Sequence, residues 1–353
     1  MTTNPIAHNQ HHDDDYYEGI KNQRCGVKDD YDHENVEIEY VIENVLFERQ
    51  EQPHHQHQHQ LQNQPSSDTV EYENLSDAFN SVLLNSCSCT STSGKSVEGA
   101  CGTYATCPHG GNYISSRTEL VLNPDRHSHD LIYECSVSCK CDPGSCDNRL
   151  VQFGPRLDLE IIASKLLHKQ YALRTNAPIP RGAFVCEYAG ELLTRSEAQR
   201  RMKDYEHQLE SGAGAEGEKE PKDCNKMNYV LCLNEYSLDG ENASSSSSST
   251  SSFQQTFVDP RLRGNIGRYL NHSCHPNCEI LSVRVDCPIP KIGIFAKRDI
   301  DAGEELCFHY NDGVGVGDVV GGVHPSKSNV NAKSIPCLCG SDNCENFLPN
   351  LEF

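Results

Sequence analysis

The sequence predicts a mainly β protein whose central domain is flanked on both sides by zinc-binding modules. Two observations lead to this prediction. Short β-forming runs fill the middle and second half of the 353-residue chain, and many of its 19 cysteines crowd into two places. A chain of this length can bury one good-sized core and carry accessory modules as well.

The first 80 residues differ in composition from the rest. They are rich in His, Gln, Asp, Glu and Asn, and they offer too few apolar groups to offset the entropy lost on ordering. We therefore expect residues 1–80 to be disordered, apart from residues 36–47 (VEIEYVIENVLF), which predict a short docking strand or helix. The histidine-rich tract at residues 54–59 is interpreted as solvated chain rather than as a metal site.

The β-forming runs lie downstream of residue 150. They alternate apolar and polar residues or are mostly apolar, as strands do, and they occupy residues 157–163, 183–192, 229–233, 256–258, 280–285 and 291–296. Thr194 and Glu197 form a capping box ahead of AQRRMKDYEHQL, which predicts one helix on the surface.

Three polar or glycine-rich stretches interrupt or follow this domain. Low-complexity loops are expected near residues 207–225 and 240–255, and a flexible glycine-rich linker at residues 313–335. The linker lacks the spacing and the Lys-Ser or Lys-Thr pair of a phosphate-binding loop.

Two groups of closely spaced cysteines predict zinc sites, because thiolate ligands must converge on one tetrahedron. The first group, too large for one ion, consists of Cys87, Cys89, Cys101, Cys107, Cys135, Cys139, Cys141 and Cys146. The second group consists of Cys337, Cys339 and Cys344, and a closed site needs a fourth ligand. The odd number of cysteines and an N-terminus unlike a signal peptide favour reduced thiols in the cytosol or nucleus over disulfides.

The charge balance limits the choice of partner. With 30 basic and 51 acidic residues, the net charge of −21 disfavours phosphate-driven binding of nucleic acid and favours a cationic protein partner.

No apolar run approaches the roughly 20 residues that a membrane-spanning helix needs.

Residues 268–278 (RYLNHSCHPNC) resemble the signature of SET-domain histone-lysine methyltransferases. Residues 303–310 (GEELCFHY) are similar to that family's G-E-E-L-x-F-D-Y motif, residues 135–148 resemble the end of its pre-SET zinc cluster, and residues 337–344 resemble its post-SET motif. The phrases CEYAGEL, TFVDP, GNIGRYLNHSC and FLP are most similar to the branch in which a SET portion is fused to a mariner transposase.

The resemblance implies a fold and a division into modules. It implies a SET-domain fold of short sheets with a pseudoknot, in which the two motif segments cross. The modules would be a pre-SET zinc cluster at residues 81–150, a SET catalytic domain at 151–312 and a zinc-binding post-SET tail at 336–353.

The resemblance also implies an activity. Enzymes of this family transfer methyl groups from S-adenosylmethionine to a lysine amine, so a histone tail, expected to be that of H3, is the implied partner in the nucleus and on chromatin. Tyr310 would be the catalytic tyrosine, and Tyr229 and Tyr188 would line the lysine tunnel. Phe308 stands where the family varies between Phe and Tyr, and Phe predicts di- or trimethylation.

Cofactor and zinc ligands follow from the same resemblance. The cofactor-binding residues would be Gln170, Tyr171, Ala172, Arg268, Asn271 and His272. Cys274 would join the three C-terminal cysteines around one zinc ion. The family's pre-SET cluster has nine cysteines and three zinc ions, whereas this chain has eight, which leaves two or three zinc ions and makes His109 a candidate substitute ligand.

Departures from the family pattern leave other interpretations open. Gln170 and Ala172 replace two glycines of the family's cofactor-contacting G-x-G, and His309 replaces an aspartate beside Tyr310. A catalytically impaired protein that keeps the zinc-braced fold as a chromatin-binding scaffold is therefore the alternative. A zinc-dependent nucleic-acid binder is a third possibility, which the negative charge disfavours.

Overall fold

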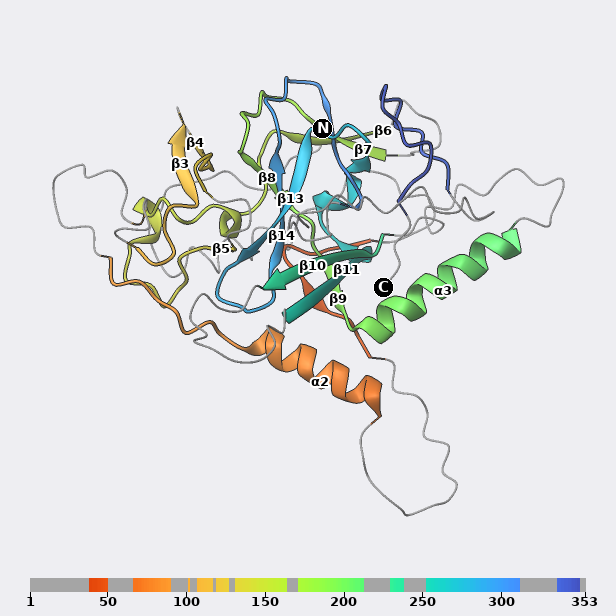
Figure 1. Cartoon of the computed structure of the whole chain (residues 1–353), viewed down its shortest axis with the longest axis horizontal. Coiled ribbons are helices and arrows are strands. Elements are labelled where there is room, and N and C mark those ends of the chain that lie inside the picture. Colours follow the sequence, from red (N-terminus) through yellow and green to blue (C-terminus); the bar gives the residue numbers. More distant parts are fainter. Residues whose placement is uncertain are drawn as a thin grey trace, which may run out of the picture.

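Three small sheets pack around a shared apolar core, with two helices along one side (Figure 1). This computed structural model describes residues 38–49, 66–89, 101, 107–116, 119–126, 131–163, 171–212, 229–237, 252–311 and 335–349. No helix within these described ranges is long and apolar enough to span a membrane.

The first sheet joins the N-terminal segment to the centre of the chain. Its strand order is β1-β11-β9-β2, and β10 pairs with β11 outside this path. The strands are β1 (Glu39–Tyr40), β2 (Val45–Leu46), β9 (Gly190–Leu193), β10 (Leu231–Ser237) and β11 (Ser252–Gly264). Residues 38–47 therefore dock as two strands that pair parallel to β11 and β9, as their apolar pattern predicts.

The second sheet supplies much of the core. Its order is β5-β13-β14-β8, and most of its residues are buried. The strands are β5 (Ile132–Tyr133), β8 (Phe184–Glu187), β13 (Cys278–Arg284) and β14 (Lys291–Ala296). The apolar runs at residues 183–192, 280–285 and 291–296 predict β8, β13 and β14, because most of the side chains that are buried there are apolar.

The third sheet brings together the two motif segments. Its order is β12-β15-β7-β6, from β6 (Leu159–Ala163), β7 (Tyr171–Thr175), β12 (Asn271–His272) and β15 (Glu305–Phe308). β12 and β15 pair in parallel, with Asn271 opposite Cys307 and His272 opposite Phe308. The segments therefore lie side by side although more than 30 residues separate them in the sequence.

The Asn277 side chain stabilises the pairing of β12 with β15 through two hydrogen bonds to β15. Its Nδ2 donates to the Glu305 carbonyl at 2.9 Å, and its Oδ1 accepts from the Cys307 amide at 2.9 Å. The side chain is only 2% exposed, so water cannot replace these two bonds.

Helix α2 (Ser67–Asn80) lies within the region that the composition predicts to be disordered. Ser66 caps its first turn by accepting a hydrogen bond from the Thr69 amide. Leu75 and Phe79 pack against the core, and Tyr72 meets Phe47 edge-on with ring centroids 5.2 Å apart. A few apolar residues at helical spacing are enough to stabilise this helix, because they pack against a surface formed by the rest of the protein.

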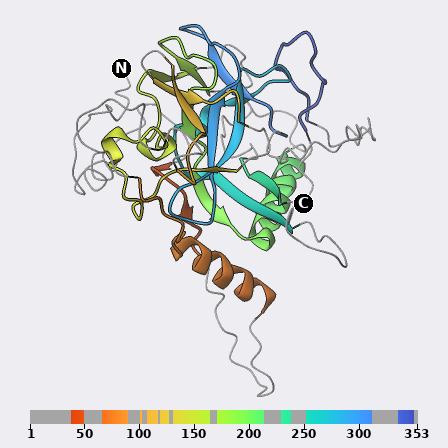
Figure 2. The same ribbon diagram turned by 60° about the vertical axis from the view of Figure 1, so that its left-hand side comes forward.

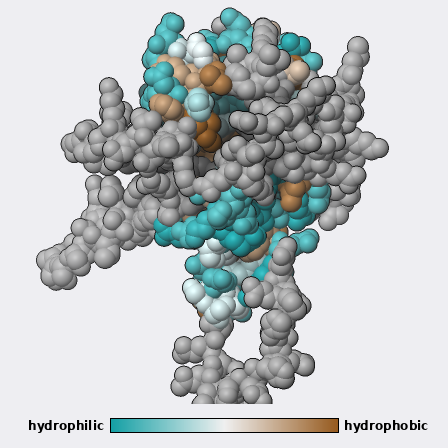
Figure 3. All heavy atoms as spheres, turned by 90° about the vertical axis from the view of Figure 1, so that its right-hand side faces the viewer, coloured by the Kyte–Doolittle hydropathy of each residue, from teal (hydrophilic) through white to brown (hydrophobic). Residues whose placement is uncertain are grey.

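Helix α3 (Arg195–Gly212) begins where the capping box predicts. The Glu197 amide donates to Thr194 Oγ1 at 3.2 Å. The helix lies on the surface as predicted, and its inner side is attached by Arg201, which forms ion pairs with Glu191 and Asp259 at 2.7 and 2.8 Å. Figure 3 shows this side of the molecule, where the described surface is mostly hydrophilic.

The predicted loops overlap these elements. Helix α3 continues to residue 212 and β11 begins at residue 252. The first residues of the loop predicted near 207–225 are therefore helical, and the last residues of the loop predicted near 240–255 belong to a strand. The remainder of both loops, and residues 313–334 of the glycine-rich linker, lie outside the described residues.

The N-terminal cysteine module lies to one side of the sheets, on the left in Figure 1 and nearer the viewer in Figure 2. Its regular structure is slight: β3 (Tyr113–Ser116), β4 (Glu119–Leu122) and two 3-10 turns at Pro143–Ser145 and Val151–Phe153. Its centre is a cluster of buried thiols instead of aliphatic side chains.

We expect Asn277→Ala to lower the free energy of unfolding by about 2 kcal/mol or more, because two buried backbone groups lose their partners. Urea denaturation of the full chain measures the change. Asn80→Ala, at an exposed helix end, is the control and should cost about 0.5 kcal/mol or less. Equal losses in the two variants would show that Asn277 does not hold the crossing together.

Candidate functional site

A cluster of aromatic rings forms where β15 ends. Tyr310 lies 5.1 Å from Phe308 between ring centroids, and Phe308 lies 6.1 Å from Tyr188, which follows β8. The Tyr310 hydroxyl donates to the Leu270 carbonyl at 3.4 Å. The crossing of the two motif segments therefore places one tyrosine hydroxyl, from after β15, against the chain that leads into β12.

Tyr229 joins this cluster through two neighbours. The Tyr188 hydroxyl donates to the Tyr229 carbonyl at 2.7 Å. The Arg268 guanidinium stacks over the Tyr229 ring at 4.6 Å and donates to the Pro260 carbonyl at 3.0 Å. The structure thus brings together Tyr310, Tyr229, Tyr188 and Phe308, the four residues predicted to be catalytic.

Burial sets the ionisation of these tyrosines. Burial raises the pKa of Tyr310 well above its ordinary value, and the neighbouring Tyr229 raises it further. Burial likewise raises the pKa of Tyr188, with Tyr310 adding to the effect. Both hydroxyls therefore keep their protons at neutral and moderately alkaline pH.

Gly267 explains the close packing beneath this cluster. It lies in a 3-10 turn at Ile266–Tyr269, between β11 and β12. A Cβ at this position would overlap the Glu187 carbonyl and approach the Tyr188 Cα to 3.0 Å. Only glycine at position 267 lets the chain lie this close to Glu187 and Tyr188 at the end of β8.

His272 connects Tyr310 to a cysteine. Its Nδ1 accepts from the Tyr310 amide at 3.2 Å, and its Nε2 lies 3.3 Å from Cys274 Sγ. Since an amide can only donate, Nδ1 is the acceptor, and in the neutral ring Nε2 carries the proton and donates to sulfur. The imidazole therefore joins the backbone at Tyr310 to Cys274.

Cys274 lies beside the three C-terminal cysteines, as the resemblance implies. The sulfur atoms of Cys274, Cys337, Cys339 and Cys344, the C-terminal cysteine cluster, all lie within 4.8 Å of one another. Cys274 and Cys337 are 3.7 Å apart between sulfurs. Sulfurs bound to one tetrahedral zinc at about 2.3 Å are separated by about 3.8 Å, so the residues fit a zinc ion and not a disulfide.

Hydrogen bonds favour the thiolate form of one member, Cys339. Burial alone would raise the pKa of Cys339, but hydrogen bonds led by that from the Ser341 hydroxyl lower it to about 5. Cys274 Sγ accepts a hydrogen bond from the Glu345 amide at 3.4 Å, in addition to the one from His272 Nε2. Such donors stabilise thiolates and orient them toward a metal.

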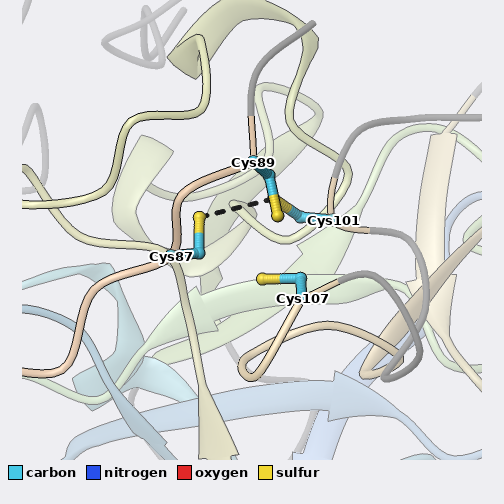
Figure 4. A group of neighbouring side chains, drawn as sticks. All are labelled: Cys87, Cys89, Cys101 and Cys107. Carbon is cyan, nitrogen blue, oxygen red and sulfur yellow. Dashed lines mark hydrogen bonds between the residues drawn. The ribbon is translucent and has the colours of Figure 1, made fainter.

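The N-terminal cysteine cluster has the same character. In Figure 4 the thiols of Cys87, Cys89, Cys101 and Cys107 converge, and all four sulfurs lie within 4.8 Å of one another. A second group of the same size shares two members with the first and consists of Cys87, Cys101, Cys135 and Cys141. Shared members are what thiolates that bridge neighbouring metal ions would produce.

Positive charge supports this cluster too. Hydrogen bonds from Cys135 and Cys146 lower the pKa of Cys141 well below its usual range. The Arg149 guanidinium, 2% exposed, lies 3.6 Å from Cys141 Sγ and acts in the same direction. Cys141 therefore favours the thiolate at neutral pH, the form that binds metal.

Comparison with known proteins identifies the family. A model of the SET domain matches residues 170–311. The probable histone-lysine N-methyltransferase set-23 of Caenorhabditis elegans is 38% identical over 258 residues, which are 72% of this chain and 87% of that protein. The chain belongs to the SET-domain family of histone-lysine N-methyltransferases.

Two further relatives agree with this assignment. The crystal structure of the methyltransferase domain of human SETMAR is 27% identical and covers 88% of this chain and 89% of that one, with a TM-score of 0.56. A histone-lysine N-methyltransferase of Arabidopsis thaliana, H3 lysine-9 specific SUVH6, is 35% identical over 222 residues, 62% of this chain and 25% of its own. The resemblance and the predicted fold class are thus confirmed, and the chain is an S-adenosylmethionine-dependent protein-lysine N-methyltransferase.

The SET-domain residues predicted to bind the cofactor have several partners within the protein. The Asn271 amide donates to the Tyr171 carbonyl and to Glu305 Oε1, each at 3.0 Å. Ala172 is fully buried in β7, and Gln170 lies outside the described residues. Arg268 contacts the Tyr229 ring with its guanidinium.

Several residues of the SET site could not be found from its motifs. The Asn44 side chain donates to Glu187 Oε1 at 3.3 Å and accepts from the Gly190 amide at 3.0 Å. It holds the chain on both sides of Tyr188. The signal was the polar residue inside the apolar run at residues 36–47, a position where a buried Asn needs partners.

We expect Cys339→Ser to remove the zinc ion of the C-terminal cluster, because three thiolates no longer close the tetrahedron. Elemental analysis of the purified chain should show one zinc fewer. Cys287→Ser, outside both clusters, should keep the full zinc content. Unchanged zinc in Cys339→Ser would remove this thiol from the ligand set.

Proposed function

We propose that this enzyme di- or trimethylates a lysine of the histone H3 tail in the nucleus, with Tyr310 as the catalytic tyrosine. The observation that supports this most strongly is the buried Tyr310 hydroxyl, which lies in an aromatic cluster and is oriented by the Leu270 carbonyl. A hydroxyl whose proton points to that carbonyl presents its oxygen to whatever enters the cluster.

The SET site suits a cationic methyl donor. S-adenosylmethionine supplies the methyl group on a positive sulfonium. Tyr188, Phe308 and Tyr310 present rings of the kind that attract such cations. Tyr171, Asn271 and His272 would hold the cofactor from the adjacent strand ends, where Asn271 already ties β12 to Tyr171.

The same rings prepare the substrate amine. A lysine near pKa 10.4 is protonated at neutral pH and cannot attack until it loses that proton. Insertion among buried aromatic side chains lowers its pKa by desolvation. Tyr310 and Tyr188 remain neutral there, so they offer hydroxyl oxygens without adding a charge that would hold the proton on the amine.

Phe308 supports the assignment of more than one methyl group. Its ring is 1% exposed and lies between Tyr188 and Tyr310. Phenylalanine brings no hydroxyl to hold a water beside the amine, so the space remains for methyl groups. The degree of methylation therefore depends on whether the residue at position 308 carries a hydroxyl group.

The H3 tail is the substrate that fits best. The net charge of −21 complements a basic tail and raises the rate at which it is encountered. The name of the Arabidopsis relative gives that protein as specific for H3 lysine 9. An array of histone tail peptides tests this: methylation of H3 peptides that is lost when lysine 9 is replaced supports the proposal, and activity confined to other histones contradicts it.

We expect Tyr310→Phe to reduce kcat at least about 100-fold with little change in folding, because only a positioned hydroxyl is removed. Mass spectrometry of an H3 peptide measures the rate. Tyr72→Phe removes a hydroxyl from the contact between α2 and Phe47 and should leave the rate unchanged. Near-normal activity of Tyr310→Phe would exclude it as the catalytic tyrosine.

We expect Phe308→Tyr to shift the product from di- and trimethyl-lysine toward monomethyl-lysine. The added hydroxyl can hold a water that crowds the methylated amine. A time course of peptide products by mass spectrometry distinguishes the two patterns. If the unmodified enzyme makes only monomethyl-lysine, the reasoning from Phe308 fails.

A further inference from the structure

His109 lies among the sulfurs of the N-terminal cysteine cluster. It is 7% exposed, and its Nδ1 lies 3.6 Å from Cys139 Sγ. A ring nitrogen of His109 and the sulfurs of Cys107 and Cys135 lie within 4.8 Å of one another. A buried imidazole that faces three thiols is arranged as a ligand and not as a packing residue.

The local backbone explains why the ring faces the cluster. Residues 107–111 form a tight turn in which the Gly110 amide donates to the Cys107 carbonyl at 3.0 Å. Gly111 follows with φ of 86°, a conformation that side chains disfavour. Asn112 then fixes the turn by donating to the His109 carbonyl at 2.6 Å.

The distances match a tetrahedral site of mixed ligands. With zinc–sulfur bonds of about 2.3 Å and zinc–nitrogen bonds of about 2.0 Å, neighbouring sulfur and nitrogen ligands are about 3.6 Å apart and neighbouring sulfurs about 3.8 Å. The His109 to Cys139 distance is 3.6 Å, and Cys107 and Cys135 are 3.9 Å apart between sulfurs. His109 therefore lies at ligand distance from Cys139 and, separately, within 4.8 Å of Cys107 and Cys135.

The connections among the groups give three sites. The group of Figure 4 shares Cys107 with the His109 group, and the second thiol group shares Cys135 with it. The two thiol groups share Cys87 and Cys101 with each other. Each pair of sites therefore has at least one thiol in common, as in a triangle of bridged ions.

A count of ligand positions leaves room for the imidazole when three thiolates act as bridges. Three four-coordinate ions have twelve positions, and nine ligands fill them when three thiolates each bridge two ions. Eight thiols with three bridges fill only eleven. A neutral imidazole nitrogen binds one ion, so His109 supplies the missing terminal position without replacing a bridge.

We propose that His109 is the ninth ligand of a three-zinc cluster built from eight thiolates and one imidazole. Cys107 and Cys135 belong to the same site as His109. The alternatives for eight thiols alone are two separate four-thiolate sites, or three ions with four bridging thiolates, and neither contains a nitrogen ligand. The proposal concerns metal binding and does not depend on the substrate or on catalysis.

The first test is metal content. Native mass spectrometry of the full chain should find four zinc ions, three in this cluster and one in the C-terminal cluster. The full chain substituted with cadmium-113 should show one resonance in the range typical of three sulfurs and one nitrogen, among resonances typical of four sulfurs. A total of three ions, or only four-sulfur resonances, would overturn the proposal.

The second test is substitution. His109→Ala should abolish the mixed-ligand resonance, and His109→Cys should keep four ions while converting that resonance to the four-sulfur type. His207→Ala, on the exposed face of α3, is the control and should leave the spectrum unchanged. A mixed-ligand resonance that persists in His109→Cys would assign the nitrogen to another residue, and the proposal would fail.

Discussion

The parallel pairing of β12 with β15 is the interaction on which the site depends. It is only two residues long, yet it places His272 opposite Phe308 and brings Tyr310 against Leu270. A pairing so short has little stability of its own, because its few hydrogen bonds must offset the entropy of joining distant segments. Neighbouring side chains supply the remaining stability. Asn277 donates to the Glu305 carbonyl and accepts from the Cys307 amide, and the His272 ring accepts from the Tyr310 amide.

Zinc binding extends this bracing to regions without an apolar core. Of the C-terminal tail, the structure describes residues 335–349, where Ile335 and Leu338 are exposed, so its thiols are what attaches it to Cys274. Because His272 contacts Cys274 on one side and Tyr310 on the other, an ion bound in this cluster would act on the proposed active site through one imidazole. The N-terminal module likewise has buried thiols in place of aliphatic side chains. The free energy of metal binding there would contribute directly to the free energy of folding.

The sequence predicted the fold class and which motif segments come together better than it predicted the individual elements around them. The residues from Arg268 to Cys278 and the Phe308–Tyr310 segment were recognisable because chemistry restricts their types, and the cysteine spacing followed from the geometry of zinc. Helix α2 and strand β12 could not be predicted, since α2 depends on a surface formed elsewhere and β12 has only two residues. The partners of Asn271 and Arg268 were also out of reach, because a motif gives a residue's identity and not the direction of its side chain.

Hydrogen exchange at the Tyr310 amide is the measurement that tests most directly whether the zinc-bound tail supports the catalytic segment through His272. It should be compared between the zinc-loaded chain and the Cys344→Ser variant, which keeps His272. The account predicts slow exchange in the zinc-loaded chain and markedly faster exchange in the variant, as Cys274 and then His272 lose their positions. Equal protection of the Tyr310 amide in both proteins would show that the active site holds its shape without the tail, which would contradict the account.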